Sequence, residues 1–337
     1  MAIKPLNIFY KEPDPDRWFK YDRYLRSVIR YLIRGKQRPG GVMLIALSLM
    51  KGLDKLGIPY RFNDFAHIRK HPDEIACIIG KPHLLFERSW INPVIFGAGV
   101  FAHPIDHPDL FSKYPNVKRF LVPGDWMKKM CEPYYGDKVL AWPAGIDTDH
   151  WSPSWNADKE FDFLIYDKRG KTDLPAQKFM HTILSEFAKK QLKHQLINYG
   201  DYSPAELKTK LANSKAVLFL SRHETQGQAY QQVLSTNTPI LAWDKGGYWQ
   251  DPAYFPYKVK YEPVSAVPYW DERCGLKFSE IEEFPLKLTQ FLKNMPEYKP
   301  RQYILEQLTL EKSAQMYCNI VEQVRKECQQ SPIPLSV

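Results

Sequence analysis

The hydrophobic pattern of this chain alternates between short continuous apolar runs and longer segments in which apolar residues recur at helical spacing. The short runs predict strands buried on both faces of a parallel sheet, and the longer segments predict amphipathic helices. Because strand and helix alternate in both halves of the chain, we expect an α/β protein with doubly wound parallel sheets. The predicted strands are Leu6–Tyr10, Ile58–Phe62, Ile75–Ile79, Pro93–Phe96, Phe120–Pro123, Val139–Trp142, Phe161–Tyr166, Gln195–Tyr199, Ala216–Leu220 and Ile240–Trp243.

Several predicted helices begin or end at residues that favour helix termini. Ser203 and Pro204 suit the N-cap and the first helical position, and Asn237 suits the left-handed position just past a helix end. Residues 252–285 are rich in proline and aromatic residues and predict no clear element. The predicted helices are Asp16–Arg34, Val42–Gly57, Asp125–Tyr134, Leu174–Lys190, Ser203–Asn213, Gln228–Thr236 and one long final helix, Tyr303–Lys326.

The stretch from Ala216 to Asp244 predicts a strand, a loop, a helix and a second strand, which together form a βαβ crossover. Its loop lies at the carboxyl end of the first strand, where open α/β sheets bind their ligands. A helix beginning at Gly227 would direct free backbone N–H groups and the positive end of its dipole toward a diphosphate there. A packing unit that binds no ligand is the alternative interpretation.

Two other loops have the composition of phosphate-binding segments. Lys168, Arg169 and Lys171 surround a glycine directly after a predicted strand, and three cations at such a loop tip would neutralise a diphosphate. A solvated basic turn is the alternative. Gly40 and Gly41 precede a predicted helix, and a glycine pair lets a phosphate approach the backbone closely, although most glycine pairs form ordinary turns.

Histidines and acidic residues follow two of the predicted strands in the first half. His103 and His107 come just after an apolar run, where an imidazole can reach a substrate through either nitrogen, or can be a loop residue without a role. Pro104 and Pro108 argue against a helix that would place both histidines around one metal ion. The Asp147–Asp149 segment has the spacing of a metal-binding DxD pair but is better interpreted as a turn.

Length and composition limit the remaining possibilities. A chain of 337 residues is long enough for two domains, and we expect the boundary just beyond an irregular segment, near Trp155. No apolar run is long enough to span a bilayer and the start lacks a signal peptide, so we expect a cytoplasmic protein. The five cysteines are odd in number and form no CxxC pair, which indicates reduced thiols without disulfides or a zinc site.

The net charge of +9 favours an anionic partner such as a nucleotide, a phospholipid surface or a nucleic acid. A nucleic-acid role is disfavoured because the basic residues are scattered and no aromatic recognition motif accompanies them. The segment Asp16–Arg34 predicts an amphipathic helix with arginines along one face. Such a helix indicates either peripheral membrane contact or an ordinary solvated basic face.

A resemblance to a known family connects several of these segments. In Ser221–Asp244, Glu224 and Gly227 match a glutamate and a glycine three residues apart, Gln232 occupies the position of a second glutamate, and Asn237–Thr238 replace a glycine before the proline. The motifs VPGDWMKKM and DKVLAWPAGIDTDHWSP, the glycine pairs at 40–41 and 246–247, and the ending LEKSAQMYCNIVEQV also match, in the right order. The chain therefore resembles the retaining, nucleotide-sugar-dependent GT-B glycosyltransferases of family 4 (glycosyl transferases group 1).

The resemblance implies the GT-B fold, in which two Rossmann-like doubly wound domains face each other across a cleft. Residues 1–154 would form the acceptor-side domain, residues 155–302 the donor-side domain, and residues 303–337 a helix that packs back on the first domain, followed by a tail. The implied activity is transfer of a sugar from a UDP-, GDP- or ADP-sugar to a carbohydrate, lipid-linked or small-molecule acceptor. The implied transfer proceeds with retention and without a metal or other cofactor.

The resemblance also assigns site residues. Glu224 would hold hydroxyls of the donor sugar, Gln232 the ribose, and the cations of the 168–171 loop the diphosphate, with His103 near the donor sugar and His107 as the competing choice. The implied catalytic residues are His103, Glu224, Lys168 and Lys171, and the implied donor-binding residues are Gly40, Gly41, Arg169, Arg222, Thr225, Gln226, Gly227, Gln228 and Gln232. Because Gln232 lacks a charge, a catalytically silent sugar-nucleotide-binding subunit is one alternative. A nucleotide-sugar epimerase of the same fold is the other.

Overall fold

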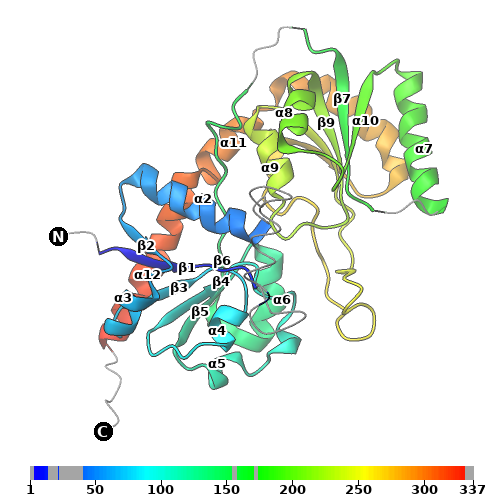
Figure 1. Ribbon diagram of the computed structural model, residues 1–337. Helices are drawn as coiled ribbons and strands as arrows, with labels where there is room; N and C mark the ends of the chain where they lie inside the picture. Colours follow the sequence, from blue (N-terminus) through cyan, green and yellow to red (C-terminus); the bar gives the residue numbers. More distant parts are fainter. Residues whose placement is uncertain (1–3, 14–21, 23–40, 154–157, 171–173, 331–337) are drawn as a thin grey trace. The chain divides into compact units, whose positions relative to one another are not determined.

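The computed structural model describes residues 4–13, 22, 41–153, 158–170 and 174–330. The described chain forms two compact units (Figure 1). Unit 1 contains the described residues of Met1–Pro123, Lys128–Gly145 and Glu311–Val337, and unit 2 contains those of Gly124–Met127 and Ile146–Leu310. Two sequence predictions fall on residues outside the described ranges. One is the domain boundary expected near Trp155. The other is the helix predicted over Asp16–Arg34, of which only Asp22 is described.

Unit 1 is built on a six-stranded parallel sheet with the strand order β2-β1-β3-β4-β5-β6. The strands are β1 (Leu6–Phe9), β2 (Tyr60–Phe62), β3 (Ala76–Ile78), β4 (Val94–Gly97), β5 (Val117–Val122) and β6 (Val139–Ala141). The helices of this half of the chain are α2 (Gly41–Leu56), α3 (Phe65–Lys70), α4 (His83–Phe86), α5 (Leu110–Lys113), α6 (Asp125–Tyr135) and, from the far end of the chain, α12 (Leu310–Gln330).

Both faces of this sheet are covered, as its continuous apolar strands require. Ile8 of β1 belongs to the core that also contains Leu49 of α2 and Tyr317 of α12. The next residue of β1, Phe9, points to the opposite face, where its ring lies 4.9 Å from that of Phe65. Helices on both faces make unit 1 doubly wound.

The carboxyl-terminal part of the chain corrects one sequence prediction. The single final helix predicted over Tyr303–Lys326 is instead two helices, α11 (Pro300–Gln307) in unit 2 and α12 in unit 1. Between them the chain is extended, with Thr309 forming a parallel bridge to Ile146 and the Ile146 N–H donating to the Leu308 carbonyl over 2.8 Å. A backbone partner outside the helix therefore interrupts an otherwise helical pattern, which periodicity alone cannot show.

Unit 2 is built on a five-stranded parallel sheet with the strand order β11-β10-β9-β7-β8. Helices α8, α9 and α11 contribute to the core on one face, and α7 and α10 to the core on the other. The elements are β7 (Phe161–Asp167), α7 (Leu174–Lys189), β8 (His194–Asn198), α8 (Pro204–Ala212), β9 (Ser214–Leu220), α9 (Gln228–Ser235), β10 (Ile240–Trp243), β11 (Gly275–Phe278) and α10 (Phe284–Asn294).

The expectation of doubly wound parallel sheets is confirmed, and each predicted strand forms with ends shifted by a few residues. The strand β11 lies in the proline-rich stretch for which the sequence predicted no element. It begins at Gly275, where an added Cβ would lie 2.0 Å from the Ile240 carbonyl oxygen. Among the described residues, no helix has the length and apolar character needed to cross a bilayer.

Candidate functional site

The order of strands in unit 2 defines where a ligand would bind. The chain passes from β7 to β8 on one side, whereas β9 pairs with β7 on its other side. In open parallel sheets the connections diverge at such a switch point, and a crevice opens outside the carboxyl ends of the two strands. The residues that follow β7 and β9 here are Lys168 and the loop Ser221–Gly227. The topology therefore brings two of the segments singled out from the sequence to the same place.

Side chains from these two strand ends contact each other directly. Lys168 Nζ lies 2.8 Å from Glu224 Oε2 and forms an ion pair with it. The other oxygen of the carboxylate, Oε1, accepts a hydrogen bond of 2.9 Å from the Ser221 hydroxyl. Glu224 is only 8% exposed, and burial of a carboxylate at this level requires such partners. The polar network fixes the carboxylate and the ammonium in one arrangement.

The loop that carries Glu224 is held from a third strand end. The Glu224 N–H donates to the Ser265 carbonyl over 2.9 Å. Asp244, which directly follows β10, accepts hydrogen bonds from the Ser265 hydroxyl and the Ala266 N–H, and it pairs with Lys277 of β11 at 3.0 Å. The position of the Glu224 backbone thus depends on a segment far away in the sequence. Ser221 and Ser265 were not identified from the sequence, although a serine directly after a buried run was an available signal for the first.

Gly227 forms the junction between this loop and α9. Its φ is +81°, in the left-handed region that glycine adopts without a steric penalty. A Cβ at this position would lie 2.1 Å from Cε1 of Tyr230, so the site has no room for a side chain. The first N–H groups of a helix have no partner within the helix, and α9 begins at the next residue. The geometry thus places a helix amino terminus beside the Lys168–Glu224 pair, as the sequence interpretation requires.

Two glutamines fix the shape of the loop before α9. Gln226 Nε2 donates to Gln231 Oε1 over 3.0 Å, and Gln231 Nε2 donates back to the Gln226 carbonyl over 3.0 Å. Both side chains are buried. Gln226, which the resemblance assigns to donor binding, therefore shapes the loop in this structure. Nothing in the sequence distinguished its partner Gln231 from the other glutamines of this segment.

Tyr230 anchors α9 from below the loop. Its fully buried hydroxyl donates to the Tyr269 carbonyl over 3.0 Å and accepts from the Tyr269 N–H over 2.9 Å. We expect Tyr230→Phe to lower the free energy of unfolding by about 1–3 kcal/mol, because the two backbone groups lose their buried partner. Urea denaturation of the purified chain measures this loss. An unchanged midpoint with an unchanged slope would show that water replaces the hydroxyl.

The other basic residues near the site have different surroundings. The Arg169 guanidinium is bound to the Asp167 carboxylate at 2.7 Å, donates to the Ala176 carbonyl and lies over the Phe179 ring. Lys168 extends over the ring of Tyr199, with Nζ 4.5 Å from its centroid. Lys171 lies outside the described residues. Among the described cations of this loop, Lys168 is therefore the one that reaches Glu224.

The remaining predicted donor-binding residues of unit 2 border the same loop. Arg222 is exposed and donates to the side chain of Gln250 over 3.0 Å, and Thr225 is exposed, whereas Gln228 and Gln232 on α9 are half-buried. Burial lowers the pKa of the neighbouring His223, and the positive charge of Lys168 lowers it further. A neutral imidazole therefore lies next to the ion pair at pH 7.

Unit 1 has the same kind of switch point, between β1 and β3. Gly41 is the first residue of α2, which follows β1 in the described chain, while Gly40 lies outside the described residues. Lys81, just after β3, pairs with Glu12, just after β1, at 3.0 Å. The strand ends of unit 1 thus also carry a cation and a helix amino terminus.

His103 and His107 differ in burial. His103 is 3% exposed, and its Nδ1 accepts a hydrogen bond of 3.0 Å from the Ile105 N–H, which leaves the proton of the neutral ring on Nε2. Burial lowers its pKa, against a smaller effect of Asp106. His107 is half-buried between the rings of Phe86 and Phe101. Of the two histidines, His103 therefore has a defined tautomer, in which Nε2 carries the proton and can donate a hydrogen bond.

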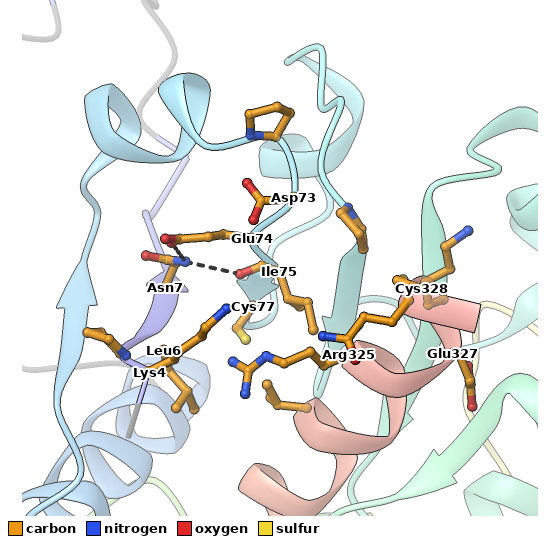
Figure 2. Close-up of a pocket in the computed structure, with 16 residues that line it drawn as sticks. Lys4, Leu6, Asn7, Asp73, Glu74, Ile75, Cys77, Arg325, Glu327 and Cys328 are labelled. Carbon is orange, nitrogen blue, oxygen red and sulfur yellow. Dashed lines mark hydrogen bonds between the residues drawn. The ribbon is translucent and has the colours of Figure 1, made fainter. Parts of the chain in front are cut away.

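The structure also contains a cavity that involves none of the predicted site residues. It has a volume of about 460 Å³ and lies in unit 1 (Figure 2). Leu6, Ile75 and Lys118 line it, so it lies at the amino-terminal ends of strands β1, β3 and β5. Parallel sheets of this type bind their ligands at the opposite, carboxyl-terminal edge. We therefore do not assign the donor to this cavity.

Comparison with solved structures shows which known fold the two units share. Sucrose-phosphate synthase from Thermosynechococcus elongatus matches with a TM-score of 0.54 at 10% identity, over 96% of this chain and 100% of that chain. A TarM variant from S. aureus, in complex with fondaparinux, alpha-GlcNAc-glycerol and UDP, matches with a TM-score of 0.51 at 13% identity, over 82% of this chain and 58% of that chain. This chain has the GT-B fold.

A further match is a chain in the structure of accessory secretory protein 1, 2 and 3 in Streptococcus pneumoniae. Its TM-score is 0.51 at 14% identity, over 77% of this chain. The present chain covers 54% of that matched chain and 58% of the TarM chain, so it spans just over half the length of these two neighbours. No family profile and no curated protein matches the sequence.

The predicted GT-B fold class is therefore confirmed, and its neighbours include glycosyltransferases. Within the GT-B chain, Lys168, Glu224 and Gly227 lie together in unit 2, whereas Gly41 and His103 belong to unit 1. At identities of 10–14% the likeness extends to the fold alone.

Proposed function

We propose that this chain is a glycosyltransferase that moves a sugar from a nucleotide-diphosphate-sugar donor to a carbohydrate or lipid-linked acceptor. The observation that carries the proposal is the Lys168–Glu224 ion pair beside the amino terminus of α9, at the switch point of the unit 2 sheet. A carboxylate that can hold sugar hydroxyls and positive groups that can hold a diphosphate lie side by side there. The GT-B fold supports the proposal by analogy.

The proposed chemistry uses these groups in separate roles. Cleavage of the bond between the anomeric carbon and the diphosphate leaves a multiply charged anion. Lys168 and the backbone N–H groups at the start of α9 would stabilise this anion, which is transition-state stabilisation by preorganised positive groups. Glu224 would bind donor hydroxyls and keep Lys168 in place through its 2.8 Å contact. We assign metal independence and retention of configuration as part of this proposal, on the basis of the family resemblance.

In this proposal, residues of unit 2 bind three parts of a donor molecule. The diphosphate would lie against Lys168, with Lys171 as a second cation, the sugar near Glu224, and the ribose near Gln232 on α9. Arg169, whose guanidinium is bound by Asp167, would support the loop. An acceptor would bind to unit 1, which contains His103 and Gly41. We propose a cytoplasmic location, with Asp16–Arg34 as a candidate for peripheral membrane contact.

A donor screen tests the proposal. UDP-, GDP-, ADP- and CMP-sugars are added to the purified chain, and its melting temperature and the release of free nucleotide are measured. A donor that binds the folded state raises the melting temperature, and an active enzyme also releases nucleoside diphosphate slowly by hydrolysis. The absence of a thermal shift with every donor class would contradict the proposal.

A catalytically silent sugar-nucleotide-binding subunit is a second candidate, and the observation that favours it is Gln232. This residue has a neutral amide where the resembling family has a carboxylate. In such a subunit a donor would raise the melting temperature without any release of nucleoside diphosphate. The donor screen distinguishes the two functions directly.

We expect Gln232→Glu to strengthen binding of the nucleoside diphosphate by about 3- to 10-fold. A carboxylate accepts hydrogen bonds from ribose hydroxyls roughly twice as strongly as a neutral amide does. Isothermal titration calorimetry with the nucleoside diphosphate measures the change, and Gln290→Glu, at an exposed position of α10, is the matched control. Equal affinities for the wild type and Gln232→Glu would remove residue 232 from the ribose site.

A further inference from the structure

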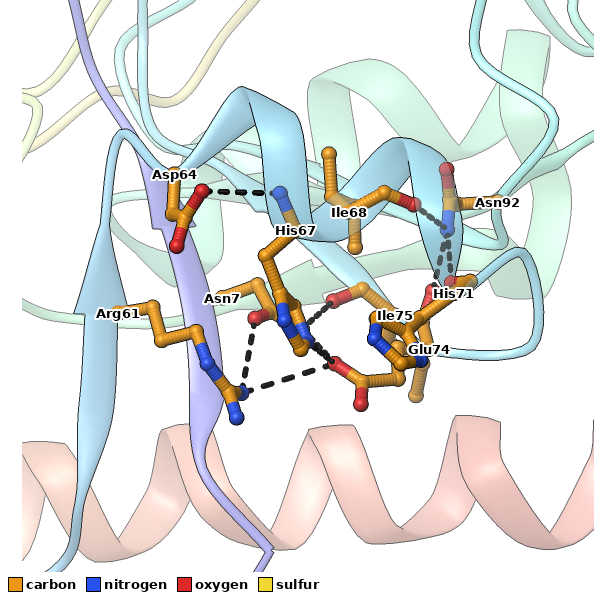
Figure 3. Close-up of polar contacts among 9 residues, drawn as sticks. All are labelled: Asn7, Arg61, Asp64, His67, Ile68, His71, Glu74, Ile75 and Asn92. Atoms are coloured by element: carbon orange, nitrogen blue, oxygen red, sulfur yellow. Dashed lines mark hydrogen bonds and ion pairs between the residues drawn. The ribbon is translucent and has the colours of Figure 1, made fainter.

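A cluster of metal-ligating side chains lies in unit 1, away from the residues discussed so far. His67 is on α3, His71 is the residue at which that helix ends, and Glu74 lies in the turn that leads to β3. Their candidate ligand atoms all lie within 4.8 Å of one another (Figure 3). The spacing of these three residues was not identified as a metal-binding pattern from the sequence.

The helix geometry explains why the two imidazoles meet. Residues four apart lie on the same face of a helix, one turn above the other. The rings of His67 and His71 accordingly stack, with centroids 4.1 Å apart. His71 leaves the helix with a φ of −126°, and the Glu74 N–H donates to the His71 carbonyl over 3.1 Å. This tight turn returns the chain so that the Glu74 carboxylate reaches the histidines.

The backbone of this turn is fixed by a buried side chain. Asn92 is 2% exposed, and its amide nitrogen donates to the carbonyl oxygens of Ile68, His71 and Glu74 at 3.2, 2.8 and 3.0 Å (Figure 3). Two of these three carbonyls belong to candidate ligands. Only the side chains of the cluster must rotate to bind an ion, and side-chain rotation is a small rearrangement compared with moving the backbone.

The carboxylate of Glu74 is already prepared to act as a ligand. Its Oε2 lies 3.0 Å from His67 Nε2, accepts from Asn7 over 2.8 Å and lies 3.7 Å from Arg61. These contacts hold the Oε2 atom of Glu74 beside the imidazole of His67.

The distances fit a small transition-metal ion. Bonds of about 2.0–2.1 Å in a tetrahedral zinc site place the ligand atoms roughly 3.3 Å apart. The His67–Glu74 separation of 3.0 Å already matches this value, and His71, which is exposed, has only to turn its ring toward the other two. Two imidazoles and one carboxylate suit zinc and its neighbours in the transition series better than Mg²⁺ or Ca²⁺.

We propose that His67, His71 and Glu74 bind a divalent transition-metal ion of the zinc class, with a fourth position open to water. The ion ties the end of α3 to the turn before β3. Glu74 also lines the cavity of Figure 2. The site is independent of the proposed transferase activity.

Calorimetric titration of the untagged full-length chain with Zn²⁺ alone tests this site. We expect the wild type to bind one ion at micromolar concentration through this cluster. His71→Ala removes an exposed ligand without disturbing packing, and it should weaken that binding by about tenfold or more, since even the loss of an outer-shell partner costs about 10- to 100-fold. His67→Ala/His71→Ala should abolish it.

The matched control removes two exposed histidines elsewhere, in His150→Ala/His181→Ala, and should bind Zn²⁺ as the wild type does. Circular dichroism of each variant shows whether its fold is retained. Two results would overturn the proposal. One is the absence of Zn²⁺ binding to the wild type at micromolar concentration, and the other is equal binding by the wild type and the folded His71→Ala variant.

Discussion

Glu224→Ala is expected to lower the rate of nucleoside diphosphate release from the bound donor by about 10²- to 10³-fold, the range observed when one preorganised group is removed from a transition-state site. The substitution removes the proposed ligand of the donor hydroxyls. It also deprives Lys168 of its partner at 2.8 Å and the Ser221 hydroxyl of its acceptor at 2.9 Å. The ammonium is then free to rotate away from the diphosphate, so both proposed roles of the network fail together.

A conservative variant separates the two roles. Glu224→Gln keeps the shape of the side chain and a hydrogen-bonding oxygen but loses the ion pair, so it should retain more activity than Glu224→Ala. Glu282→Ala, at an exposed position of unit 2, is the matched control and should leave the rate unchanged. Wild-type rates for Glu224→Ala, with the fold verified by circular dichroism, would exclude Glu224 from the proposed site.

Gly227→Ala is expected to reduce the free energy of unfolding by about 2–5 kcal/mol, the sum of two separate penalties. The first is steric and local, because a φ of +81° costs an alanine about 1–2 kcal/mol. The second is overpacking of about 1–3 kcal/mol, since the new Cβ would lie 2.1 Å from Cε1 of Tyr230. The buried ring cannot move away without breaking its two hydrogen bonds to Tyr269, so the loop before α9 must shift.

A second glycine isolates the local penalty. Gly200 has a φ of +96°, but a Cβ there would have no heavy atom within 4 Å. Gly200→Ala should therefore lose only the first contribution, about 1–2 kcal/mol. Urea unfolding of both variants gives the difference, and thermal-shift titration with the donor shows whether Gly227→Ala also weakens donor binding. Equal losses of stability in the two variants would refute the packing contribution of Tyr230.

Much of the site could be located from the sequence because it lies at strand ends. A buried run followed by polar residues identifies the carboxyl end of a strand in a parallel sheet, and Lys168 and Glu224 both occupy such positions. The sequence could not show that these two ends are neighbours, because the pairing of β7 with β9 skips a strand. It also could not distinguish Lys168 from Arg169, whose guanidinium is directed to Asp167 by side-chain geometry.

The cluster at residues 67–74 illustrates the converse limit. Its two histidines are four residues apart, and a helix places such residues side by side, so the sequence could have indicated that they meet. The turn that adds Glu74 depends on Asn92, which is far along the chain and fixes three carbonyl groups at once. A pattern of residues can indicate which side chains share a helix face, but not which distant side chain folds the next turn.

The sequence by itself determined the two doubly wound sheets, because the periods of apolar residues in strands and helices are local properties of the backbone. It also determined the glycine that opens α9, since glycine adopts a left-handed conformation without a steric penalty. The tertiary structure decided the break between α11 and α12, the position of β11 and the partners of Lys168, Gln226 and Glu74. These features depend on contacts between residues distant in the chain, and such contacts are set by how the elements pack, which no local pattern specifies.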